Sequence, residues 1–134
     1  MMLVDTNVLI DVLEDDADWA DWSLQQLRAQ SQVHELVINP VIYAELALTF
    51  TTIEALDATL DRLRMPLREL PRPALFLAGK AFARYRQQGG TRHSVLADFF
   101  IGAHAAVTGM PVLTRDVSRY KSYFPTVRLV SPGI

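Results

Sequence analysis

Four acidic residues stand in apolar surroundings, where an unpaired carboxylate is costly. Asp5 follows the apolar run MLV, Glu45 lies within VIYAELAL, Asp98 lies within VLADFFIGAHAA, and Asp116 follows PVLTR. Burying a lone carboxylate costs several kcal/mol unless it is paired or bound to a cation. Arg115 stands next to Asp116 and could pair with it, but no basic residue stands beside the other three. We therefore treat these four acids as candidates for a shared site.

Carboxylates that gather in one place repel each other, and divalent cations are the simplest way to keep them ionised. The chain has no cysteine, so a metal would sit on oxygen or imidazole, and carboxylate and water ligands favour Mg²⁺ or Mn²⁺. Such a site suits hydrolysis of a phosphodiester, because bound cations activate water and stabilise the leaving oxygen. Taken singly, Asp5 or Asp98 could instead be a helix cap or a first-turn acid.

Short apolar runs alternate with longer segments of helical period, which predicts an α/β fold with a central, mostly parallel sheet. The expected strands are 1–4, 36–38, 65–70, 111–114 and 128–130. The expected helices are 6–13, 16–30, 40–47, 51–64, 73–88 and one that holds Asp98 and ends before Gly109; 115–125 is expected to be a loop with one helical turn. Thr6 and Thr51 are the expected caps of their helices, Thr51 through a capping box with Glu54.

The predicted sheet would bring the four acids to one edge. Ligands of open α/β sheets bind at the carboxyl ends of the strands. Asp5 and Asp116 each follow a strand, and Glu45 and Asp98 lie on helices that begin at the same edge.

Size and charge bound the function further. The 134 residues and 50% hydrophobic content predict a single domain, 1–134, with one core. Residues 1–61 hold twelve of the fifteen acids, and residues 62–134 hold twelve of the thirteen basic residues. This segregation predicts either a cationic region that follows phosphates or helix faces that pair with each other. No membrane span or signal sequence is evident, so we expect a soluble, cytoplasmic protein.

In sequence order, the segments LVDTNVLIDVLE, INPVIYAELAL, LADFFIGAHAAVTGMPVLTRD and RYKSYFPTVRLVSP resemble the PIN-domain nucleases, and among them the VapC-type toxins. The resemblance covers nearly the whole chain. It implies a three-layer α/β/α sandwich and an endoribonuclease dependent on Mg²⁺ or Mn²⁺. Asp5, Glu45, Asp98 and Asp116 match the acidic quartet of the family.

The resemblance also assigns supporting residues and partners. Thr6 and Asn7 match the polar pair that would orient the first aspartate, and Thr114 matches the hydroxyl residue near the fourth acid. It implies a homodimer and a small antitoxin that inhibits the site, often through a basic side chain. We expect either that the antitoxin groove includes Trp19 and Trp22 or that these tryptophans are ordinary core residues.

Several other residues carry weaker hypotheses. Arg115 could bind a substrate phosphate or form a structural ion pair. Candidates for contact with the RNA backbone are Arg92, Arg119 and Lys121. His34, His93 and His104 lack the paired spacing of metal ligands.

Other functions start from the same sheet. A haloacid-dehalogenase type of phosphotransferase would need an aspartate where Asn7 stands. A receiver-like binding module would need an aspartate at the end of the third strand, where Leu70 and Pro71 occur. A nuclease of the PIN fold that acts on DNA or flap structures is also an alternative, because the sequence has no motif that reads the 2′-hydroxyl.

Overall fold

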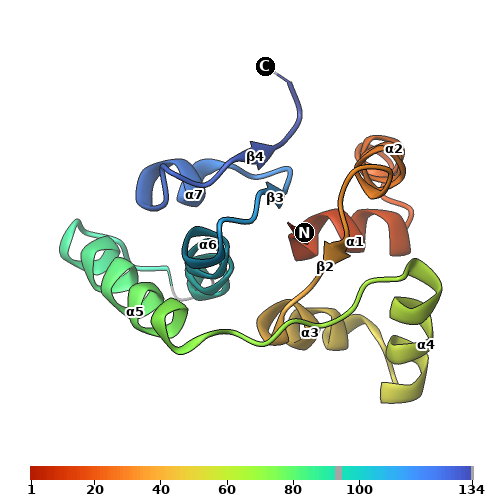
Figure 1. Cartoon of the computed structure of the whole chain (residues 1–134), viewed down its shortest axis with the longest axis horizontal. Coiled ribbons are helices and arrows are strands. Elements are labelled where there is room, and N and C mark those ends of the chain that lie inside the picture. Colours follow the sequence, from red (N-terminus) through yellow and green to blue (C-terminus); the bar gives the residue numbers. More distant parts are fainter. Residues whose placement is uncertain (93–94, 134) are drawn as a thin grey trace.

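A four-stranded parallel sheet forms the centre of the computed structural model, which describes residues 1–92 and 95–133 (Figure 1). The strands are β1 (Met2–Val4), β2 (Leu36–Val37), β3 (Val112–Leu113) and β4 (Leu129–Val130), in the order β2-β1-β3-β4. Val4 pairs with Leu113, so the next residues, Asp5 and Thr114, leave the two central strands at the same level. The register alone therefore places these two side chains together at the carboxyl ends of the central strands, which we call the carboxyl edge of the sheet.

Helices cover the sheet in a three-layer α/β/α arrangement, as predicted. They are α1 (Thr6–Leu13), α2 (Ala20–Ser31), α3 (Pro40–Leu46), α4 (Ile53–Leu63), α5 (Arg72–Gln87), α6 (Leu96–Thr108) and α7 (Ser118–Tyr123), with a single 3₁₀ turn, η1 (Ala47–Thr49), after α3. Helix α1 packs on α2, whereas α6 packs on both α5 and α7. Helix α3 contacts α1 and α6, so it connects the two helical groups next to the sheet edge (Figure 1).

The ends of the two helices that carry acids are fixed locally. Asn39 caps α3, because its side-chain oxygen accepts a hydrogen bond from Ile42 N at 2.9 Å, and Pro40 occupies the first helical position. Helix α6 ends where Gly109 adopts φ +72°, a left-handed conformation that glycine adopts without strain. Glu45 and Asp98 are thus carried on helices with well-defined termini.

Three predictions about elements are wrong. Residues 65–70 do not form a strand; they make only an isolated parallel bridge between Leu67 and Ile38, because Pro66 cannot donate a ladder hydrogen bond. The cap of α4 is Thr52 rather than Thr51, and its hydroxyl accepts from Ala55 N at 3.1 Å. Residues 16–19 form a turn held by Asp16, so α2 begins four residues later than expected.

The core is continuous from the sheet to the helices and includes Leu3, Ile101 and Leu113. Trp22 packs against it while remaining half-buried, which agrees with the core alternative for this tryptophan. In the ranges 1–92 and 95–133, no helix has the length and apolar character that crossing a bilayer requires.

Candidate active site

Asp5 is the most deeply buried of the four acids, with 5% of its surface exposed. It follows β1 and occupies the N-cap position of α1, but its side chain does not cap the helix. Its Oδ2 atom accepts hydrogen bonds from Tyr120 Oη at 2.7 Å and from Thr114 Oγ1 at 2.9 Å. Burial raises the pKa of Asp5, and these two hydrogen bonds oppose the rise. The carboxylate is therefore held in one orientation by two buried hydroxyl groups.

The predicted partners of Asp5 form a small network. Asn7 Nδ2 lies 3.5 Å from Asp5 Oδ2 and 3.3 Å from Thr114 Oγ1. Thr114 Oγ1 also accepts from Asp116 N at 3.1 Å, and Asn7 Oδ1 accepts from Arg115 N at 3.3 Å. Asn7 and Thr114 thereby connect the start of α1 to the loop after β3.

Thr6 lies elsewhere than expected. It is the first residue of α1 rather than its cap, and its hydroxyl donates to Glu45 Oε1 at 2.5 Å. The hydroxyl of Thr6 therefore orients the second acid, whereas its backbone N–H acts on the first by helping to lower the pKa of Asp5. This bond joins α3 to the end of β1 and brings Glu45 to the edge where Asp5 lies.

Asp98 lies in the first turn of α6 and is half-buried. Burial raises its pKa to about 7, and the charges of three other acids add to the rise. In decreasing order of effect these acids are Asp5, Asp116 and Glu45. The four carboxylates thus lie within electrostatic range of one another, although they come from four separate parts of the chain.

Asp116 is the exposed member of the group. Its Oδ1 atom accepts from Ser118 Oγ at 2.7 Å and from Ser118 N at 3.2 Å. The hydrogen bond from the Ser118 side chain is the main reason why the pKa of Asp116 is lowered. No ion pair reaches this carboxylate within residues 1–92 and 95–133, so the expected alternative of a direct pair with Arg115 is not found there.

Arg115 instead pairs with Asp11. Its Nε donates to Asp11 Oδ2 at 2.8 Å and its Nη2 donates to Asp11 Oδ1 at 3.0 Å. Ser23 Oγ completes the buried network with a 2.9 Å hydrogen bond to Asp11, and the guanidinium lies 5.6 Å from the centre of the Trp19 ring. This geometry favours the structural alternative for Arg115 and gives Trp19 a role in supporting it.

The donor set fits a divalent cation of the Mg²⁺ type. Across the described residues, no three acidic or histidine side chains are spaced to hold one ion directly. Mg²⁺ commonly keeps several waters and takes only one or two carboxylates from the protein, so acids that lie within electrostatic range of one another suit it without forming a closed cage. Asp5 and Asp98 are the acids whose pKa is raised by burial, and a neighbouring cation would favour their charged forms.

The histidines have other surroundings. His104 is buried on α6, where its Nδ1 lies 3.2 Å from Asn39 Nδ2. His34 lines a surface pocket between α2 and the segment after α4, together with Arg64. His93 lies outside the described residues.

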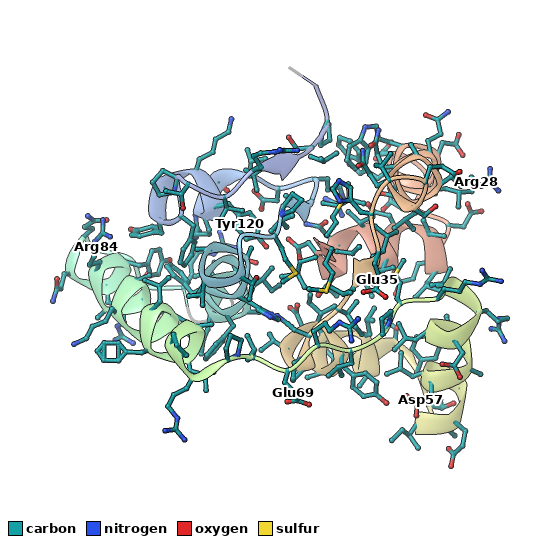
Figure 2. All side chains as sticks on the ribbon, in the orientation of Figure 1. Arg28, Glu35, Asp57, Glu69, Arg84 and Tyr120 are labelled. Atoms are coloured by element: carbon teal, nitrogen blue, oxygen red, sulfur yellow. The ribbon has the colours of Figure 1, made fainter. Side chains whose placement is uncertain are left out.

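Two features of the site were missed in the sequence. Tyr120, which lies in the interior (Figure 2), donates directly to the first acid, and no local pattern in SRYKSYF indicates this role. Asn39 joins the cap of α3 to α6 through His104. The dipeptide Asn39-Pro40 is a recognisable helix start, so this cap could have been predicted.

Comparisons with known proteins concern the family and the fold of the chain. The model of the PIN domain family matches residues 2–122. No curated protein matches the sequence significantly. Among solved structures, a chain of VapBC2 from Rickettsia felis, bound to a DNA fragment from its promoter, has a TM-score of 0.73 at 18% identity, with 98% of each chain covered.

Two further structures are similar. A chain of VapBC-1 from nontypeable Haemophilus influenzae has a TM-score of 0.73 at 17% identity, covering 97% of this chain and 96% of its own. A chain of FitAcB from Neisseria gonorrhoeae has a TM-score of 0.65 at 19% identity, with 96% of each chain covered. At these identities the likeness concerns the fold.

Proposed function

The chain belongs to the PIN domain family, and on that premise we propose that residues 1–134 form a single-domain, metal-dependent endoribonuclease of the VapC type. The observation that carries the proposal is the meeting of Asp5, Glu45 and Asp98 at the carboxyl edge of the sheet. Each comes from a different element, and the charges of the other two raise the pKa of Asp98. A receiver-like module has no use for acids on α3 and α6, so this convergence favours the nuclease.

Each side chain has a defined task in the proposed reaction. Asp5, held by its two hydroxyl donors, and Asp98 would hold Mg²⁺ or Mn²⁺, with Glu45 and Asp116 at the sides of the site. A bound divalent cation would supply an activated water and charge for the leaving oxygen. Thr6, Asn7 and Thr114 fix the orientation of the acids through the hydrogen bonds described above, because preorganised ligands need not be rearranged during the reaction.

RNA is the substrate that we propose. Exposed basic residues lie along α5 and in the segment after it. Arg84 projects at the outer end of this helix (Figure 2). A cationic surface binds phosphates without regard to sequence, and the family resemblance favours RNA over DNA. The test therefore also includes DNA and flap substrates. Cleavage of one of these in place of RNA would change the proposed substrate.

The test incubates the purified chain with single-stranded RNA, single-stranded DNA and a flap duplex, in Mn²⁺, in Mg²⁺ and in EDTA. We expect RNA cleavage only with metal, and a loss of about 100-fold or more in Asp5→Asn and in Asp98→Asn. Asp61→Asn is the matched control, because it removes an exposed acid from α4. Cleavage in EDTA, or wild-type rates in either site variant, would contradict the mechanism.

We also propose two protein partners, a second copy of the chain and an antitoxin. The support is a shallow apolar groove beside Glu45, formed by α3, the turn η1 and the start of α6. Leu48 is 88% exposed at one end of the groove and Leu96 is 39% exposed on the other side. Exposed apolar surface of this kind marks interaction sites. An antitoxin that covers this groove could place a basic side chain against Glu45.

Light scattering, together with a binding assay for the antitoxin, distinguishes which of the two partners covers the groove. A dimer of the isolated chain that becomes a monomer in Leu48→Asp would assign the groove to the second copy. A dimer unaffected by Leu48→Asp, combined with loss of antitoxin binding in the same variant, would assign it to the antitoxin. A monomeric wild-type chain would contradict the homodimer.

A further inference from the structure

Arg119 is a cation at the acid cluster, and within residues 1–92 and 95–133 no acid pairs with it by contact. It lies on α7, between Ser118 and Tyr120, which bond to Asp116 and Asp5. Its charge lowers the pKa of both Asp98 and Asp116, so it lies within electrostatic range of both. No ion pair within 4.0 Å involves Arg119 among the described residues.

The guanidinium of Arg119 has an unused donor. Its Nε atom is buried and has no hydrogen-bond partner in the described part of the chain. A buried N–H group without a partner costs about 1–3 kcal/mol, so such groups are rare unless a ligand completes them. By contrast, Nε and Nη2 of Arg115 both donate hydrogen bonds to Asp11.

The position of Arg119 is fixed by an aromatic platform. Its guanidinium carbon lies 5.3 Å from the centre of the Tyr85 ring, within the range of a cation–π contact. The Tyr85 ring is itself packed against Phe82 at 5.8 Å and Phe99 at 5.5 Å. Its hydroxyl accepts from Arg92 N at 3.2 Å. A cation on this platform is preorganised, so little side-chain entropy is lost when an anion binds.

We propose that Arg119 binds a non-bridging phosphate oxygen of the nucleic acid strand at the acid cluster. The inference rests on the proposed function and names the residue that seats the substrate there. Planar guanidinium groups match the geometry of phosphate oxygens. Arg119 would offset the repulsion between the strand and the four carboxylates, and it would place the phosphate beside the water that is to attack it.

A purely structural alternative is that Arg119 is only a counter-charge that stabilises the acids. The two roles differ in what a substitution changes. A counter-charge affects the unfolding temperature and the affinity for Mn²⁺, whereas a phosphate ligand affects the binding of a nucleic acid strand even without metal. The test therefore measures strand binding separately from metal binding and cleavage.

The binding experiment uses fluorescence anisotropy with a labelled 12-nucleotide single-stranded RNA in EDTA at low salt. We expect Arg119→Gln to weaken binding about ten- to hundredfold, the range for a hydrogen bond to a charged group. Arg28→Gln is the matched control: it removes an equal charge from an exposed arginine in the last turn of α2, outside the basic surface along α5. We expect at most about a threefold effect there, because only a remote charge is lost.

Arg119→Lys keeps the charge and guards against a folding defect in Arg119→Gln. We expect intermediate strand binding, with the unfolding temperature and Mn²⁺ affinity close to those of the wild type. Equal loss in Arg119→Gln and Arg28→Gln, or wild-type binding in both Arg119 variants, would overturn the proposal. If the wild type cleaves no RNA, the proposed function fails, but the binding comparison still decides the role of Arg119.

Discussion

Asp98→Asn should make the metal-free protein more stable at pH 8, although it removes a proposed metal ligand. Asparagine has nearly the shape of aspartate but no charge. The carboxylate of Asp98 is half-buried among three other acids, and its pKa is raised to about 7 from an ordinary value of 3.8. Without a cation, burial and repulsion therefore destabilise the folded chain when Asp98 is ionised. The neutral amide introduced by Asp98→Asn avoids both effects.

The sign and size of the effect follow from linkage. Below pH 3.8 both the folded and the unfolded chain hold the proton, and the group has no effect on stability. Between pH 3.8 and about 7 the unfolded chain has lost the proton while the folded chain keeps it, so stability falls as pH rises. Three pKa units correspond to about 4 kcal/mol when a group is fully shielded. Solvent screening at this half-buried site reduces the expected gain to about 1–2 kcal/mol.

Urea unfolding in EDTA at pH 8 and at pH 5 measures the effect. We expect the gain from Asp98→Asn at pH 8 to shrink at pH 5, and added Mn²⁺ to stabilise the wild type more than the variant. Asp116→Asn is the matched control, because hydrogen bonds to Ser118 lower the pKa of Asp116. Its carboxylate contributes stability that is present above pH 3.8 and lost as pH falls, so this variant should gain nothing at pH 8.

An Asp98→Asn variant no more stable than the wild type in EDTA at pH 8 would refute the reasoning. It would mean that neither burial nor repulsion by the other acids destabilises the ionised carboxylate of Asp98 in the folded chain. The shared cation site would then lose its electrostatic basis, whatever the activity of the enzyme.

Three further predictions concern single contacts. Tyr120→Phe removes a hydroxyl that donates to Asp5; we expect Mn²⁺ affinity, measured by titration calorimetry, to fall about 10–100-fold, and unchanged affinity would exclude a positioning role. Gly102→Ala adds a methyl group where the ring of Phe124 lies and should cost about 1–3 kcal/mol in urea unfolding, whereas Gly79→Ala, with open space around it, should stabilise by about 0.5–1 kcal/mol; the opposite order would contradict the packing. Asp11→Asn removes a buried partner of a guanidinium and should cost about 3 kcal/mol by the same assay, so a neutral effect would show that the pair contributes little.

Much of the fold could be predicted because local patterns and sheet topology agree. The apolar run before Asp5 and the run before Thr114 became neighbouring central strands, as buried parallel strands do. Helices with clear start and stop signals, such as the one ended by Gly109, were placed to within a residue or two. Residues 65–70 show the limit: an apolar run with proline fits both an edge strand and an extended segment, and only tertiary pairing distinguishes the two.

The acids of the candidate site were predictable for a similar reason. A carboxylate within an apolar segment needs a partner, and the apolar residues around Glu45 and Asp98 in the sequence indicate that need. Specific hydrogen bonds were not predictable. Thr6 bonds to Glu45, 39 positions away, and such a contact depends on how α1 and α3 cross rather than on neighbours in the chain. The same holds for Arg115, whose two possible roles could be compared only when Asp11 was located.

The hydrogen bonds to Asp5 span 109 and 115 positions of the chain. During synthesis, the hydroxyl donors of Asp5 are made more than a hundred residues after it. A nascent chain that stops before Val112 has neither the central strand pair nor the groups that orient this carboxylate. An interrupted translation product therefore lacks the assembled acid cluster.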